Sequence, residues 1–110
     1  MTQNERIKKL ESYLEGYRLY RTVKALADTG REDPVLTAEM AMRKMREIRA
    51  FVSDLPNGRE KIFLHCHYIA DRNMEECADM LGVSLRSVYR IRLRALKLAL
   101  CYFYREKAAG

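Results

Sequence analysis

Three observations predict an all-α protein. Glycine and proline number only five and two in 110 residues, so few positions interrupt a helix. Between those positions the apolar residues recur every three or four residues, which is the period of one helix face. No segment sustains the alternation of apolar and polar residues that is typical of a half-buried strand. We therefore expect long helices joined by short turns.

Two long helices are expected in the N-terminal half. The first covers roughly residues 3–28 and ends near Gly30, and Pro34 prevents its resumption. The second covers roughly residues 36–54. Its apolar seam comprises Ala38, Ala41, Met45, Ile48, Val52 and Leu55. Because the linker is short, we expect residues 1–55 to form an antiparallel helical hairpin that serves for packing or dimerisation.

A third helix is expected over residues 58–71, after the break at Pro56. Asn57 with Glu60 three residues later predicts its N-cap and capping box. Asn73 with Glu76 predicts a second capping box, at the start of a short helix over residues 74–81. The inward face of the third helix would comprise Ile62, Phe63, Cys66, Ile69 and Ala70.

Residues 74–93 have the spacing of a helix-turn-helix. In this motif a small residue at the fifth position lets the helices approach, and a glycine at the ninth tolerates the positive φ of the turn. Counting from Met74, these positions hold Ala78 and Gly82. The shared core requires apolar residues at five further positions, which are Cys77, Leu81, Val83, Val88 and Ile91. Agreement at every constrained position predicts a helix-turn-helix.

Ser84 is the expected N-cap of the second, recognition helix. Arg86 and Arg90 lie opposite its buried face, and we expect them to contact bases, because arginine can bind guanine edges with two hydrogen bonds. Arg94 and Lys97 are expected to contact phosphates. The other residues near the start of this helix, where base edges are usually reached, are Leu85, Ser87 and Tyr89.

The positive charge of the chain is confined to its C-terminal quarter. Residues 1–82 contain 14 Lys/Arg and 14 Asp/Glu, whereas residues 83–110 contain seven Lys/Arg, including Lys107, and one acidic residue. The formal net charge of +6 therefore lies entirely in that quarter. Such a local positive field indicates a polyanionic partner, and a solvated basic helix face is the alternative. Arg92 projects toward the core side, so an internal salt bridge is an equal alternative for it.

The stretch from Leu55 to about Leu98 resembles region 4 of bacterial sigma-70 factors. The resemblance is carried by the Leu-Pro before the third helix, Arg59-Glu60-Lys61, EECADMLGVS and SVYRIRLRAL. It implies that residues 56–110 form a region 4-like module with a long C-terminal helix, which reads a promoter element and contacts RNA polymerase. Leu85-Arg86 and Tyr89-Arg90 stand where sigma factors typically carry Arg-Glu and Arg-Gln, so a −35-like target is not predicted. The layout also resembles phage-encoded late-operon activators of the RinA and ArpU type.

The C-terminal helix carries a second apolar row, consisting of Tyr89, Leu93, Leu96, Leu100 and Phe103. Two apolar faces on one helix require two partners. The second partner is either the N-terminal hairpin or a second subunit, and a homodimer would present two recognition helices to two half-sites.

Several other classes of site are not expected. Residues i and i+2 of a helix point about 200° apart, so His65 and His67 cannot bind one metal ion. No nucleophile–base pair, phosphate loop or carboxylate pair stands out, so neither an enzyme nor a cofactor is predicted. Cys66, Cys77 and Cys101 are interpreted as reduced, buried thiols. With no membrane span or signal peptide in sight, a cytoplasmic location is expected.

These patterns predict a sequence-specific transcriptional regulator that binds double-stranded DNA. The helix beginning near Ser84 would enter the major groove. The alternative is a helical adaptor that binds RNA polymerase or another protein without reading DNA.

Overall fold

The computed structural model describes residues 1–106, and within them it contains helices and no strand. The elements in order are α1 (Gln3–Asp28), α2 (Ala38–Ser53), α3 (Arg59–Leu64), the π-helical turn η1 (His65–Ile69), α4 (Met74–Leu81) and α5 (Leu85–Glu106). The predicted all-α class is confirmed. Within the described residues, no helix combines the length and apolar character needed to cross a membrane.

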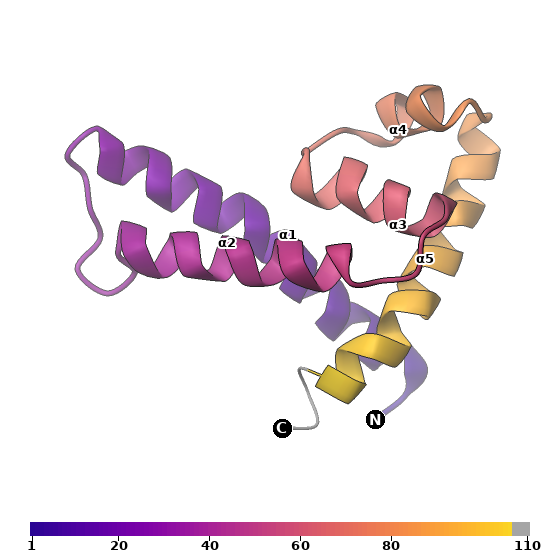
Figure 1. Cartoon of the computed structure of the whole chain (residues 1–110), viewed down its shortest axis with the longest axis horizontal. Coiled ribbons are helices and arrows are strands. Elements are labelled where there is room, and N and C mark those ends of the chain that lie inside the picture. Colours follow the sequence, from indigo (N-terminus) through magenta and orange to yellow (C-terminus); the bar gives the residue numbers. More distant parts are fainter. Residues whose placement is uncertain (107–110) are drawn as a thin grey trace.

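Helices α1 and α2 lie side by side and run in opposite directions (Figure 1). Thr2 and Thr37 cap their N-termini, because each threonine hydroxyl accepts a backbone N–H three residues later. The cap at Thr37 starts α2 at Ala38 instead of the expected residue 36. The apolar seam predicted for the second helix faces α1, and the fully buried residues of the two helices include Leu10, Leu14, Ala41 and Ile48.

The segment after Pro56 differs from its prediction. The expected helix over residues 58–71 is instead a short α3 followed by η1, in which the N–H of Ala70 donates to the carbonyl of His65 at 2.9 Å. The predicted N-cap at Asn57 is wrong, because Gly58 holds that position and no side chain bonds there. The Asn57 side chain accepts a hydrogen bond from Lys61 Nζ instead, at 3.1 Å.

The inward face of α3 and η1 also differs from its prediction. Ile62 and Ala70 are exposed, and the buried residues are Phe63, Leu64, Cys66, Tyr68 and Ile69. A π-helical turn is wider than an α-helical turn, which changes the order in which side chains reach the core. Here three of the five residues of η1 are buried.

Helices α4 and α5 are joined by a tight turn. The predicted capping box at Asn73 and Glu76 is present in both directions, at 2.8 and 3.1 Å. Gly82 ends α4 in the left-handed region, with φ of 67°, and the following N–H of Val83 bonds back to the carbonyl of Ala78 at 3.0 Å. This closure turns the chain directly into α5.

Helix α5 packs against two parts of the chain in succession. Near its start, Val88 and Ile91 are buried where α5 meets α3 and α4. Further along, Phe103 joins Tyr13 of α1 and Phe51 of α2 in a cluster of rings whose centroids lie 5.2–6.1 Å apart. The α1–α2 pair is therefore the partner of the second apolar row at Phe103, and Leu96 of the same row is also buried.

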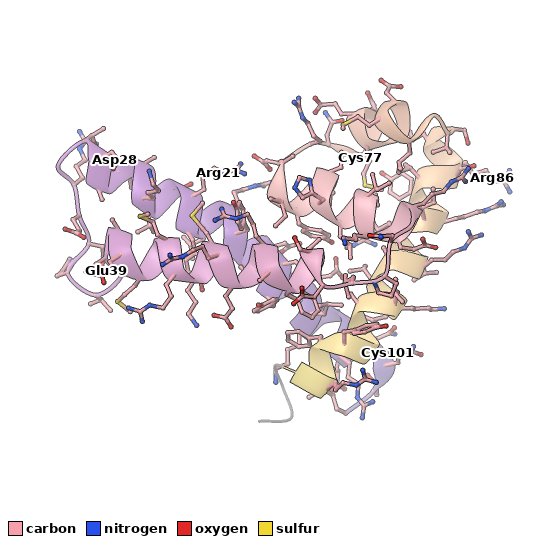
Figure 2. The ribbon with its side chains drawn as sticks, viewed as in Figure 1. Arg21, Asp28, Glu39, Cys77, Arg86 and Cys101 are labelled. Atoms are coloured by element: carbon pink, nitrogen blue, oxygen red, sulfur yellow. The ribbon has the colours of Figure 1, made fainter. Side chains whose placement is uncertain are left out.

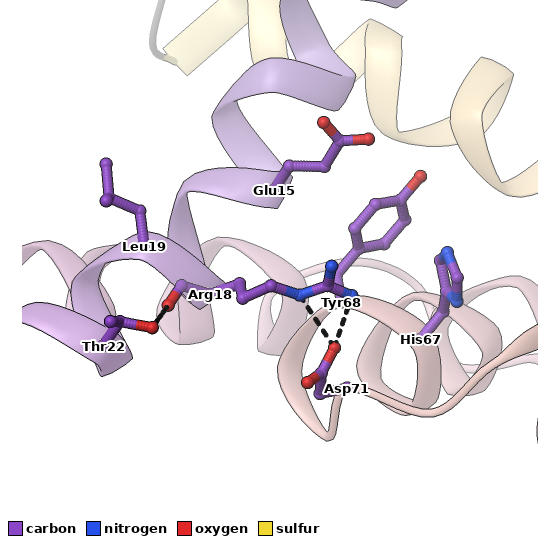
Figure 3. A pocket seen from close by; sticks show the side chains of 7 residues that line it. All are labelled: Glu15, Arg18, Leu19, Thr22, His67, Tyr68 and Asp71. Atoms are coloured by element: carbon purple, nitrogen blue, oxygen red, sulfur yellow. Dashed lines mark hydrogen bonds and ion pairs between the residues drawn. The ribbon is translucent and has the colours of Figure 1, made fainter. Parts of the chain in front are cut away.

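Polar contacts also hold α1 against the rest of the chain. Glu11 forms an ion pair with Arg92 of α5, and Arg21 donates a hydrogen bond to the carbonyl of Ile69. Arg18 bonds Asp71 through Nε and Nη2, at 3.0 and 2.5 Å, beside a cavity of about 430 Å³ between α1 and η1 (Figure 3). Asp71 has φ of 58°, a conformation that Asp adopts more readily than most residues.

Candidate nucleic-acid interface

The start of α5 is fixed by its cap. Ser84 Oγ accepts a hydrogen bond from the N–H of Ser87 at 3.1 Å, and the two serine hydroxyls are 3.0 Å apart. Ser84 is therefore the N-cap of α5, as the sequence predicts. The Ser84 hydroxyl both accepts and donates within this local structure, and Ser87 is half-buried. The residues that follow present their side chains from a helix whose first turn is well defined.

Two parallel stripes run along the exposed face of α5. The first consists of Arg86, Arg90 and Arg94, which are all exposed and follow one another at intervals of four residues. The second is offset by one residue and consists of Leu85, Tyr89 and Leu93. Arg86 projects from α5 on the side away from the α1–α2 pair (Figure 2). We call these the arginine stripe and the apolar stripe.

The exposed cations of α5 are not neutralised by ion pairs. Among the side chains that the structure describes, those of Arg86, Arg90, Arg94 and the exposed Lys97 have no acidic partner. Arg92, on the other side of the same helix, is paired with Glu11. The face therefore keeps its positive charge, and this charge favours an anionic partner.

Arg92 has the structural role that the sequence left open. Its ion pair with Glu11 joins α5 to α1, and its positive charge lies near enough to the Tyr68 hydroxyl to favour the ionised form of that group. Burial of Tyr68 outweighs this effect and raises the pKa of its hydroxyl to about 12, so this side chain stays neutral. Arg92 therefore belongs to the core side of α5 and not to its exposed face.

The second apolar row divides at the middle of α5. Leu96 and Phe103 are buried, whereas Tyr89 and Leu93 are exposed. Leu93 thus belongs to the candidate interface, although the sequence interpretation did not include it there. Its position four residues after Tyr89 and four before Lys97 was the available signal. Lys107, which contributes to the C-terminal charge, lies outside the described residues.

Two of the three cysteines are buried against each other, and the third is exposed. Cys77 Sγ lies 3.1 Å from Cys66 Sγ, and both side chains are buried as predicted. Burial raises the pKa of the Cys77 thiol to about 12, with a further contribution from its contact with Cys66, so the thiolate is disfavoured. Cys101 is exposed, contrary to prediction, because it continues the exposed face one turn after Lys97.

The comparisons with known proteins report no match. Neither a family model nor a curated protein nor a solved structure matches the chain. The functional proposal therefore depends on the exposed face of α5. Its distinguishing properties are four cations on one helix that have no ion pair in the described part of the chain, next to exposed apolar side chains.

Proposed function

We propose that this chain is a sequence-specific transcriptional regulator that binds double-stranded DNA with the start of α5 in the major groove. In this proposal α4, the turn at Gly82 and α5 act as a helix-turn-helix resembling region 4 of sigma-70 factors. The observation that carries the proposal is the arginine stripe, which is exposed and unpaired in the described structure. Residues 56–110 would form the DNA-binding module, and residues 1–55 its packing partner.

The length of the cationic face, from the arginine stripe to Lys97, suits a major groove. Arg86 and Lys97 are eleven residues apart, which corresponds to roughly 16 Å along a helix axis. The groove is about 12 Å wide and admits a helix, so the first turns can meet base edges while the later turns reach the backbone. Arg86 and Arg90 are thus assigned to bases, and Arg94 and Lys97 to phosphates.

The test is a titration of random-sequence duplex DNA by fluorescence anisotropy at two salt concentrations. Contact with about six phosphates predicts an affinity loss of roughly 10³-fold between 50 and 200 mM salt. The double variant Arg90→Gln/Arg94→Gln should weaken binding strongly. The matched control Arg43→Gln/Arg46→Gln removes the same charge from exposed positions of α2 and should have little effect.

Two results would overturn the proposal. One is the absence of binding even at low salt, and the other is an equal loss of affinity in the two double variants. Arg90→Ala adds a finer test, because a base-reading arginine should lose preference for a selected site more than it loses affinity for random DNA. Equal losses of affinity for the selected site and for random DNA would assign Arg90 to phosphate contact.

The second candidate function is that of an adaptor that docks on RNA polymerase or another protein. A cavity of about 510 Å³, lined mainly by apolar atoms, lies between the end of α2, α3 and α4, and Ile62 and Met80 are exposed on it. Exposed apolar surface of this kind favours protein contact. Ile62→Ser should abolish such docking and leave DNA affinity unchanged, which separates the two functions.

A further inference from the structure

Large apolar side chains lie exposed beside the arginine stripe of α5. Leu85, Tyr89 and Leu93 are 44%, 54% and 47% exposed, although the same helix buries other apolar residues completely. They run parallel to the arginine stripe and are offset from it by one residue, or about 100° around the helix. Any partner that the arginines attract must therefore also meet this apolar stripe.

The major groove offers one kind of apolar group to such a stripe. Its edges display hydrogen-bond donors and acceptors from every base pair, and the 5-methyl group of thymine is the apolar feature among them. Cytosine methylated at the same carbon presents the same group. Leucine has no hydrogen-bonding group and the tyrosine ring is apolar, so either side chain can pack on a methyl group.

We propose that Leu85 and Tyr89 recognise pyrimidine 5-methyl groups, and that thymine supplies them. This inference rests on the proposed DNA-binding function and adds a requirement on the sequence of the site. Leu85 is the first residue of α5 and Tyr89 lies one turn later, at the end of the helix that would reach the bases. The two positions are roughly 6 Å apart along the axis, or about two base-pair steps.

A second copy of this chain fits the stripe less well. Docking two apolar stripes against each other would bring Arg86, Arg90 and Arg94 of both copies close together. Those side chains have no acidic partners within the described residues, so the two faces would repel. DNA satisfies both stripes together, because it presents methyl groups on the groove floor and phosphates at its edges.

The experiment uses a duplex selected by the full chain from a random pool. Each thymine of that duplex is replaced in turn by uracil, which lacks only the 5-methyl group, and affinity is measured by anisotropy. We expect about a fourfold loss at one or two positions that lie close together. This is the equivalent of ~0.8 kcal/mol for one buried methyl group. Methylation of the cytosines should leave affinity unchanged.

Variants assign the methyl contact to its side chain. For Leu85→Ala, replacing the thymine at one of the sensitive positions by uracil should no longer change the affinity. For Tyr89→Ser, the same should hold at the neighbouring sensitive position. Ile62→Ala is the matched control, because Ile62 is also exposed but lies on α3. It should keep the wild-type preference for thymine. Circular dichroism checks that each variant is folded.

The possible outcomes separate this inference from the function on which it rests. If salt-dependent binding persists and no uracil replacement changes affinity by more than about twofold, methyl recognition is wrong and DNA binding stands. A gain on cytosine methylation without a loss on uracil replacement overturns the assignment to thymine. Failure to bind any duplex refutes the DNA-binding function itself. Retention of the thymine preference by Leu85→Ala and Tyr89→Ser overturns the residue assignment.

Discussion

Replacement of Gly82 by alanine tests the turn that joins α4 to α5. Gly82 has φ of 67° and ψ of 34°, and a Cβ added there would meet no atom within 4 Å. The effect should therefore come from the backbone alone. Holding an alanine in the left-handed region costs roughly 1–2 kcal/mol. The reduced freedom of the unfolded chain offsets about 0.4–1 kcal/mol of this, which leaves a net loss of about 1 kcal/mol.

The assay is urea and thermal unfolding followed by circular dichroism. A loss of about 1 kcal/mol should lower the Tm by roughly 4–5 °C in a chain of this size. Gly30→Ala is the matched control, because Gly30 also has positive φ, at 85°, and an equally open surrounding, but lies after α1. Its expected loss is the same.

Two outcomes would refute this reasoning. A loss above about 3 kcal/mol for Gly82→Ala alone would mean that the new methyl group meets packed atoms or that the turn rearranges. A loss below about 0.3 kcal/mol would mean that residue 82 can leave the left-handed region without disturbing α5. In either case the start of the arginine stripe would not be fixed in the way described.

Three further predictions concern the core, a cap and the thiols. Phe103→Ala should cost about 3–5 kcal/mol in urea unfolding, because it empties the ring cluster between α5 and the α1–α2 pair; a loss under about 1 kcal/mol would contradict that packing. Asn73→Ala should cost about 1 kcal/mol because it removes the side-chain oxygen that accepts from the N–H of Glu76, whereas the backbone N–H of residue 73 still donates to Glu76; Asn73→Asp should retain most of the stability. Mass spectrometry after brief maleimide treatment of the folded chain at neutral pH should find Cys101 modified and Cys66 and Cys77 protected, and modification of all three would refute their burial.

The features that the sequence predicted well depend on nearby residues. The capping box at Asn73 and Glu76 involves groups three residues apart, so its pattern is complete within one turn of chain. The left-handed glycine at residue 82 is equally local. The bounds of α1 match the expected residues 3–28 for the same reason, since a repeated apolar spacing and a glycine define them.

The features that the sequence did not predict depend on packing between distant segments. The spacing of Asn57 and Glu60 fits a capping box, but the Asn57 side chain accepts a hydrogen bond from Lys61 instead. The Lys61 ammonium group also donates to the carbonyl of Ser53 at the end of α2. The π-helical turn likewise forms where η1 meets α1, α4 and the end of α3, and no local pattern encodes those neighbours.

The part of the candidate interface that depends on the periodicity of α5 alone could be predicted from the sequence. The positions opposite the row of Val88 and Ile91 were expected to be exposed, and they are. The exposure of Leu93 was not expected, because it depends on how far along α5 the helices α1 and α2 make contact. Ring contacts bring α1 and α2 to Phe103, in the last turns of the helix, and the apolar row before Leu96 stays uncovered.

The different roles of the arginines on α5 follow from the direction in which each side chain points from the helix, because the residue type is the same. Arg90 and Arg92 are two residues apart and point in nearly opposite directions. Arg92 joins α5 to α1 through Glu11, so it fixes the orientation of the helix relative to the α1–α2 pair. Arg90 remains unpaired in the described structure. Two arginines only two residues apart can therefore differ in role: Arg92 holds α5 in place, and Arg90 is available to a partner.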